Sequence, residues 1–123
     1  MAQQSRLTTD ICIIGAGSGG LSVAAGAVQM GARVVLVEGA EMGGDCLNAG
    51  CIPSKALIAA AKHAHAMTTA APFGITPVAP QIDFAAVKDH VTRVIETIAP
   101  LDSQERFEGL GVQVIDGYFS RYF

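Results

Sequence analysis

The alternation of apolar and polar positions along the chain predicts short strands and helices. Residues 10–14 form an apolar run rich in β-branched side chains, which predicts a fully buried parallel strand, and residues 33–38 predict a second strand. The small residues from about 18 to 30 predict a helix between them, with Gly31 as its C-terminal stop. A strand, a helix and a strand in this order favour the α/β class with a parallel sheet.

Further elements are predicted beyond this first unit. Residues 53–67 are rich in alanine, with apolar positions at helical spacing, which predicts a long helix. The stretch 70–80 is rich in proline and small residues and is interpreted as an irregular connection, with room for a short edge strand at 73–75. Residues 111–117 predict a third parallel strand.

A helix is also predicted from Asp83, as its N-cap, to about residue 110, and Pro100 should break or kink it. Its apolar side chains recur at helical spacing, and we expect them to pack into the core rather than to form a binding groove. They are Phe84, Val87, Val91, Val94, Ile95 and Ile98.

A glycine-rich turn of the type GxGxxG at residues 15–20 joins the first strand to the first helix. Gly15 permits the tight turn, Gly17 lets the backbone approach a pyrophosphate, and Gly20 allows close packing of helix on strand. The helix begins near Ser18, so its N-terminus would face the phosphates. Glu38 ends the second strand eighteen positions after Gly20, where a carboxylate can accept hydrogen bonds from adenosine ribose hydroxyls.

Two cysteines, Cys46 and Cys51, stand five positions apart in the glycine-rich stretch 43–55. The small residues between them let the chain curl enough to bring the sulfurs within bonding reach. So small a ring gains little stability from loop entropy, so a structural staple is not expected. Cys51 lies at the start of the helix that contains Pro53, where free N–H groups favour a thiolate, and Lys55 adds a positive charge nearby. A thiolate is the reactive species in thiol–disulfide exchange.

Other interpretations of these thiols stay open at this point, namely unrelated core residues or a metal site. Zinc is poorly supported because four ligands are usual and no second matching pair follows, although His63 and His65 leave a ligand role open. We predict no metal. Cys12 lies inside the first strand and is expected to be a small core residue rather than a third redox thiol.

Taken together, the turn at 15–20 and the stretch 43–55 (Gly-Gly-Asp-Cys-Leu-Asn-Ala-Gly-Cys-Ile-Pro-Ser-Lys) resemble the N-terminal part of the pyridine nucleotide–disulfide oxidoreductases. This family includes dihydrolipoamide dehydrogenase, glutathione reductase and mercuric reductase. The resemblance covers nearly the whole chain and implies a single Rossmann-like, three-layer FAD-binding domain over residues 1–123, incomplete relative to the family. Asp45 departs from the usual threonine and is similar to a mercuric-reductase-like subgroup, which leaves the substrate open.

The resemblance also implies residue roles. Cys51 would be the charge-transfer thiol against the flavin, Cys46 the interchange thiol that meets the substrate, and Lys55 a cation near flavin N5. Electrons would pass between NAD(P)H, FAD, the Cys46–Cys51 disulfide and a small thiol or disulfide substrate. The residues expected to bind FAD are Gly15, Gly17, Ser18, Gly20, Glu38, Gly44, Asp45 and Lys55.

Composition excludes several other classes of function. The net charge of −3 and the scattered basic residues offer no stripe for nucleic acid. No window has the length and apolarity of a membrane span, and the N-terminus is unlike a signal peptide. An odd number of cysteines, three, with a redox motif suits a reducing cytosol, so we expect a cytoplasmic protein.

The length of 123 residues suffices for one compact domain, whereas the family's enzymes are several times longer. We therefore expect NAD(P)H binding only in a full-length relative, and an isolated chain without turnover although the family is enzymatic. The alternative function is a truncated, non-catalytic dinucleotide-binding fragment. His63, His65 and His90 match no catalytic base motif and are expected to face solvent. The aromatic residues at 118–123 predict a surface that a partner, such as a second copy of the chain, would cover.

Overall fold

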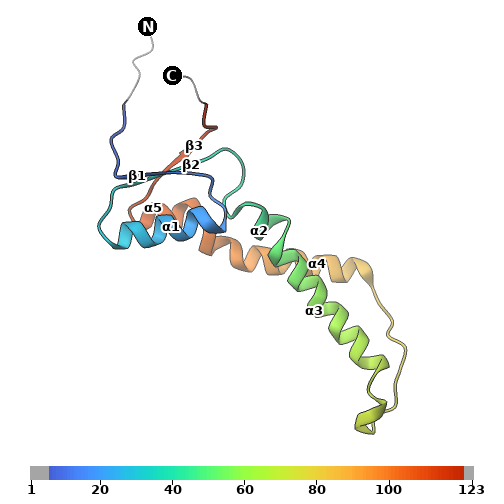
Figure 1. The fold of residues 1–123 in the computed structure, drawn as a ribbon. Helices are drawn as coiled ribbons and strands as arrows, with labels where there is room; N and C mark the ends of the chain where they lie inside the picture. Colours follow the sequence, from blue (N-terminus) through green and yellow to red (C-terminus); the bar gives the residue numbers. More distant parts are fainter. Residues whose placement is uncertain (1–5, 121–123) are drawn as a thin grey trace. The chain divides into compact units, whose positions relative to one another are not determined.

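The computed structural model describes residues 6–120 and divides the chain into two compact units (Figure 1). One unit, here called the sheet unit, comprises residues 1–44 and 99–123, and the other, the helical unit, comprises residues 45–98. The class is α/β with a parallel sheet, as the sequence predicts. Each unit is described on its own below, and a single domain over residues 1–123 stays a prediction.

The sheet unit alternates strands with helices along the sequence. The first predicted βαβ unit is confirmed, with boundaries within one residue of those expected, and the strand predicted near 111–117 is present. The elements are β1 (Ile11–Ile14), α1 (Ser18–Gln29), β2 (Val34–Glu38), the 3₁₀ helix η2 (Ala99–Asp102), α5 (Gln104–Gly109) and β3 (Gln113–Asp116). Gly31 follows the end of α1 with a φ of +87°, which suits a glycine and confirms it as the stop signal.

The three strands form one parallel sheet in the order β1-β2-β3. Leu36 at the centre of β2 pairs with Ile13 of β1 and with Val114 of β3. Helices α1 and α5 pack on the same side of this sheet (Figure 1). All three strands therefore end at the same edge, directly beside the turn that leads into α1.

The core of the sheet unit lies between the sheet and these two helices. Leu36 from β2 and Phe107 from α5 are its largest fully buried side chains, and Leu21 and Ala24 contribute the buried face of α1. Small residues on α1 let the helix axis approach the strands closely, so even short side chains fill the layer. The cluster consists of Ala16, Leu21, Ala24, Val34, Leu36, Phe107 and Val112.

The prediction that β1 is fully buried is wrong. Its residues alternate, with Ile11 and Ile13 half-buried, whereas Cys12 and Ile14 are exposed, the latter at 58%. The reason is that β1 is an edge strand and the described residues of the sheet unit place helices on one face only. Cys12 is accordingly not the core residue that the apolar run suggested.

An ion pair joins the starts of β1 and β2. The Arg33 guanidinium donates to both carboxylate oxygens of Asp10, over 2.7 and 3.1 Å, and the Arg33 backbone N–H donates to the same carboxylate over 2.8 Å. These bonds lower the pKa of Asp10 to about 2. Asp10 thus fixes where β1 begins to pair with β2.

The helical unit is formed mainly by two long helices that pack against each other (Figure 1). Its elements are α2 (Gly44–Asn48), α3 (Cys51–Thr68), the 3₁₀ helix η1 (Ala71–Phe73) and α4 (Phe84–Ile98), where Gly44 is the last residue of the sheet unit. The helix predicted at 53–67 is confirmed, and the helix predicted from Asp83 is confirmed as far as Ile98. Asp83 caps α4, since its carboxylate accepts the N–H groups of Ala85 and Ala86 over 3.0 and 3.2 Å.

Three details differ from the sequence-based expectation. The stretch 43–55 contains the short helix α2 rather than only a loop. No strand occurs at 73–75 among the described residues, because Ala71–Phe73 form a 3₁₀ helix that Gly74 ends with a φ of +73°. Pro100 does end α4, as predicted, but the chain continues through η2 and a separate helix, α5, that starts after Ser103.

The apolar stripe of α4 packs on α3, but no residue of α4 is fully buried and Phe84 is 62% exposed, so it is only partly the core face expected. His63 and His65 are exposed, as predicted, whereas His90 is partly buried. Tyr118 and Phe119 are exposed, and residues 121–123 of the predicted aromatic surface lie outside the described residues.

Gly20 is the position where α1 approaches β1 most closely. A Cβ built there would lie 2.0 Å from the Gly15 carbonyl oxygen and 3.2 Å from Ile13 Cγ2. The prediction that Gly20 permits close helix–strand packing is thereby confirmed.

We expect Gly20→Ala to lower the free energy of unfolding by about 3 kcal/mol, because the clash is with backbone that cannot move away. Urea unfolding followed by circular dichroism measures this. Gly26→Ala is the matched control, since it lies in the same helix with nothing within 4 Å of its Cβ, and it should stabilise the chain by about 0.5–1 kcal/mol. Equal stabilities for the two variants would contradict this account of the packing.

Candidate functional site

The turn between β1 and α1 has a backbone that only glycine adopts readily at its first position. Gly15 has a φ of +98°, and its N–H donates to the Val37 carbonyl of β2 over 2.8 Å. This bond holds the turn against the carboxyl end of the sheet. The role predicted for Gly15, a tight turn, is what its geometry provides.

Gly17 is the N-cap of α1 and borders open space. Its φ of −75° and ψ of 179° are extended, and a Cβ added there would meet nothing within 4 Å. The first turn of α1, from Ser18, contains no acidic residue and no side chain of the described residues caps it. The N–H groups at this helix end therefore suit an anion that approaches the backbone at Gly17.

Gly43 and Gly44 lie along the same turn. Gly43 donates its N–H to the Ala16 carbonyl over 2.9 Å and forms a parallel bridge with Gly17. A Cβ on Gly44, whose φ is +57°, would lie 2.8 Å from the Cα of Gly17. The structure thus brings Gly44 beside Gly17, as expected for residues of one binding site.

Glu38 at the end of β2 is fixed by backbone donors. One of its carboxylate oxygens accepts the Ala16 N–H, and the other accepts the Ala40 N–H over 2.8 Å. The Ala16 N–H is the main cause that holds the pKa of Glu38 below its usual range, and the N–H groups of Ala40 and Gly39 act in the same direction against the effect of burial. Glu38 is therefore an ionised acceptor fixed beside the glycine turn.

The bond from Ala16 to Glu38 does not follow from the sequence. The spacing places an acid near the turn, but only the folded structure shows that the carboxylate also stabilises the turn. The residues of the sheet unit fit the pyrophosphate and ribose of a dinucleotide, since backbone N–H groups, an open approach at Gly17 and a fixed carboxylate occur together.

The thiol pair belongs to the helical unit. Cys46 lies in α2, and Cys51 is the first residue of α3, after the N-cap Gly50. A Cβ on Gly50 would lie 2.9 Å from the Asp45 carbonyl oxygen, so glycine allows the close turn that joins the two helices. The prediction that Cys51 stands at a helix N-terminus, with Pro53 in the first turn, is confirmed.

The two cysteines are free thiols. Hydrogen bonding with the Cys51 side chain is the main cause that raises the pKa of Cys46. Burial and the negative charge of a Cys51 thiolate raise it further, whereas the Cys51 N–H and the Lys55 charge lower it. Cys51 and Lys55 are exposed, as is Asp45 in the first turn of α2. A disulfide between the two cysteines stays a prediction.

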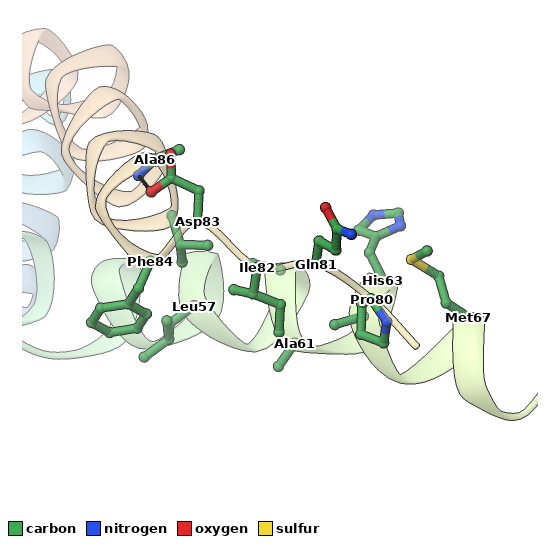
Figure 2. Close-up of a pocket in the computed structure, with 13 residues that line it drawn as sticks. Leu57, Ala61, His63, Met67, Pro80, Gln81, Ile82, Asp83, Phe84 and Ala86 are labelled. Atoms are coloured by element: carbon green, nitrogen blue, oxygen red, sulfur yellow. Dashed lines mark hydrogen bonds between the residues drawn. The ribbon is translucent and has the colours of Figure 1, made fainter. Parts of the chain in front are cut away.

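An apolar groove of about 400 Å³ lies elsewhere in the helical unit, between α3 and the segment that leads into α4 (Figure 2). Its lining contains neither cysteine, and Asp83 at its edge is turned towards the N–H of Ala86. We do not assign the redox site to it. Residues that line it include Leu57, Ala61, His63, Met67, Ile82 and Phe84.

Among residues 6–120, no group of three or more His, Cys, Asp or Glu side chains is arranged to hold a metal ion. No helix between residues 6 and 120 combines the length and apolarity needed to cross a bilayer.

Comparisons with known proteins agree with this geometry. The sequence model of the pyridine nucleotide-disulphide oxidoreductases matches residues 9–115. The chain is 42% identical over 119 residues to a dihydrolipoyl dehydrogenase of Pseudomonas aeruginosa, covering 91% of this chain and 25% of the relative. It is 44% identical over 85 residues to a mercuric reductase of Streptomyces lividans, covering 68% of this chain and 18% of the relative. It thus spans about a quarter or less of these relatives' lengths.

A solved structure is also similar. The HOCl-induced flavoprotein disulfide reductase RclA of Escherichia coli, determined as a Cu(II) complex, matches with a TM-score of 0.65 and 27% identity. The match covers 86% of this chain and 21% of RclA.

The hydrogen bond between the thiols predicts how Cys46 reacts with alkylating reagents. We expect Cys51→Ala to lower the pKa of Cys46, because the main cause of its rise is lost. At about pH 8, below the ordinary thiol pKa of about 8.5, Cys46 should then be alkylated faster by iodoacetamide. The measurement is the rate of Cys46 alkylation as a function of pH, read by peptide mass spectrometry.

Lys55→Met should have the opposite effect on Cys46. The Lys55 charge lowers the pKa of Cys46, so its removal should raise that pKa and slow the alkylation. Exposed Cys12 serves as the internal reference thiol and should react alike in every variant. A pH profile of Cys46 that stays unchanged in Cys51→Ala would show that the two thiols are not coupled.

Proposed function

Since the chain belongs to the pyridine nucleotide-disulphide oxidoreductase family, we propose that it binds FAD and exchanges electron pairs through Cys46 and Cys51. The family is FAD-dependent, with NAD(P)H as its electron donor. The observation that carries the proposal is the placement of Cys46 in α2 and of Cys51 at the N-terminus of α3, joined by the close turn at Gly50.

The sheet unit supplies the residues that would hold the cofactor. Gly15 and Gly17 present the backbone and the N-terminus of α1 to the pyrophosphate, and Glu38 would accept the ribose hydroxyls. Each Glu38 oxygen already accepts one N–H group and keeps a second lone pair for a hydroxyl. Ser18, Gly20 and Gly44 complete the same turn. Bound FAD would supply a two-electron carrier.

The helical unit supplies the thiol chemistry. Oxidation of the pair forms one Cys46–Cys51 bond and releases two electrons and two protons, and reduction reverses this. The position of Cys51 at the N-terminus of α3 supports Cys51 as the thiol that carries the charge, which leaves Cys46 as the thiol that meets the substrate. Lys55 would offset that negative charge, and Asp45 would modify contacts to the cofactor.

The proposed substrate is a small-molecule thiol or disulfide, or a metal ion that thiols bind. A dihydrolipoyl dehydrogenase and a mercuric reductase among the relatives support both possibilities. Cytoplasmic location and assembly with a second copy belong to the same proposal. The apolar side chains of Ile14, Tyr118 and Phe119 are exposed, which supports a surface on the sheet unit that a second copy would cover.

FAD binding is tested with Gly17→Ala. The added methyl group would occupy the open space where the pyrophosphate approaches, so loss of one charge-assisted hydrogen bond should weaken FAD binding by roughly tenfold or more. Equilibrium dialysis with FAD measures the dissociation constant. Gly26→Ala, which is exposed in the same helix, should bind FAD as the wild type does. Equal affinities of all three chains would contradict the assigned cofactor position.

The disulfide is tested by oxidation with oxidised glutathione and digestion with trypsin. Cleavage after Arg33 and Lys55 releases both Cys46 and Cys51 in residues 34–55, and Cys12 in residues 7–33. Attack of one thiol on glutathione disulfide followed by attack of the second should leave the 34–55 peptide two hydrogen atoms lighter and resistant to alkylation.

Cys51→Ser is the control for this experiment, and it should leave a stable glutathione adduct on Cys46. Cys12→Ser should not change the outcome for the pair. Glutathione adducts on both Cys46 and Cys51 of the wild type, without a link between them, would rule out the redox pair.

A further inference from the structure

The tip of the helical unit presents an exposed aromatic side chain on a fixed turn. Phe73 ends the 3₁₀ helix η1, which follows α3 (Figure 1), and it is 82% exposed. Its N–H donates to the Ala70 carbonyl over 3.0 Å, and the Val78 N–H closes the turn on the Met67 carbonyl over 2.9 Å. A ring on a backbone that is already fixed loses little freedom when a partner covers it, so Phe73 suits insertion into another surface.

The apolar groove between α3 and the segment that leads into α4 lies on the same unit (Figure 2). Its volume is about 400 Å³, whereas an apolar cavity of about 150 Å³ already accepts a benzene-sized ring. The Asp83 carboxylate at its edge accepts two backbone N–H groups, so a ring that enters leaves no carboxylate there without a partner. The groove therefore fits a phenyl ring.

We propose that Phe73 of one copy of the chain inserts into this groove of a second copy, which inserts its own Phe73 in return. Ring and groove belong to one compact unit, so a single two-fold rotation forms both contacts at once. Such an interface closes on itself and gives a dimer rather than an open row of copies. The inference does not depend on FAD binding and concerns a surface other than the exposed side chains of the sheet unit.

The exposed apolar surface is larger than a ligand confined to the groove would cover. Five large apolar side chains around the groove and the tip are between 43 and 62% exposed, in addition to Phe73. The six side chains leave roughly 650 Å² uncovered in each copy, so two copies would bury about 1,300 Å², within the range of about 1,200–2,000 Å² for stable interfaces. They are Leu57, Met67, Phe73, Ile75, Ile82 and Phe84.

Sedimentation equilibrium measures the dissociation constant of the dimer, with dithiothreitol present so that exposed Cys12 does not link copies. We expect Phe73→Ala to weaken the dimer by roughly hundredfold or more, because each dimer loses two buried rings. Ala61→Glu places a charge in the groove and should weaken the dimer similarly. Two controls should leave the dissociation constant unchanged. Met30→Ala removes an apolar side chain that is 88% exposed in the sheet unit, and Ala59→Glu makes the same change on α3 outside the groove lining.

An equal mixture of the Phe73→Ala and Ala61→Glu chains tests the exchange itself. The first chain keeps its groove and the second keeps its ring, so a mixed pair forms one intact contact, and the mixture should contain more dimer than either variant alone. A mixture without this gain would overturn the reciprocal insertion.

Three other results would also overturn the proposal. A wild-type chain that stays monomeric at millimolar concentration has no such interface. A dimer that persists unchanged in Phe73→Ala is held by another surface, such as the exposed side chains of the sheet unit. Wild-type assemblies that grow beyond the dimer do not close by a two-fold exchange.

Discussion

The close approach of α1 to the turn after β1 is the constraint on which the rest of the sheet unit depends. Gly20 lies over the Gly15 carbonyl with no room for a side chain, so the helix begins directly at the edge of the sheet. That placement lets Leu21 and Ala24 reach the core while the N-terminus of α1 stays open at Gly17. One steric contact therefore fixes both the packing of the helix and the direction in which its N–H groups point.

Glu38 adds an electrostatic constraint to this steric one. Its carboxylate joins the end of β2 to Ala16 in the turn and to Ala40 beyond the strand. A charge placed here would repel a pyrophosphate if it were not compensated, but the backbone donors offset it. The turn is consequently held in one shape by groups that a ligand need not displace, and such preorganisation lowers the cost of binding.

The sequence predicts those features that depend on neighbouring residues. The βαβ unit, the glycine turn, the Asp83 cap and the helix that starts at Cys51 all follow from local patterns. The errors concern features set by distant parts of the chain. The apolar run around Cys12 looks like a buried strand, yet its exposure depends on what covers the second face of the sheet. The contact of Tyr118 with Gly39 requires β3 to pair with β2. The pattern of apolar residues along the sequence does not predict which residues of the two strands pair.

The same distinction between local and distant contacts applies to the thiol pair and the proposed nucleotide site. The thiol pair is assembled from residues within one helix–turn–helix segment, where Gly50 permits the turn and the start of α3 receives Cys51. The placement of the two cysteines therefore needs only local folding, and the motif in the sequence is sufficient to find it. The proposed nucleotide site instead combines the turn after β1 with the end of β2, so it requires these two strands to be paired in the sheet. Loss of sheet packing should thus abolish cofactor binding while leaving the placement of the two cysteines intact, which makes thiol–disulfide exchange the more robust of the two proposed properties.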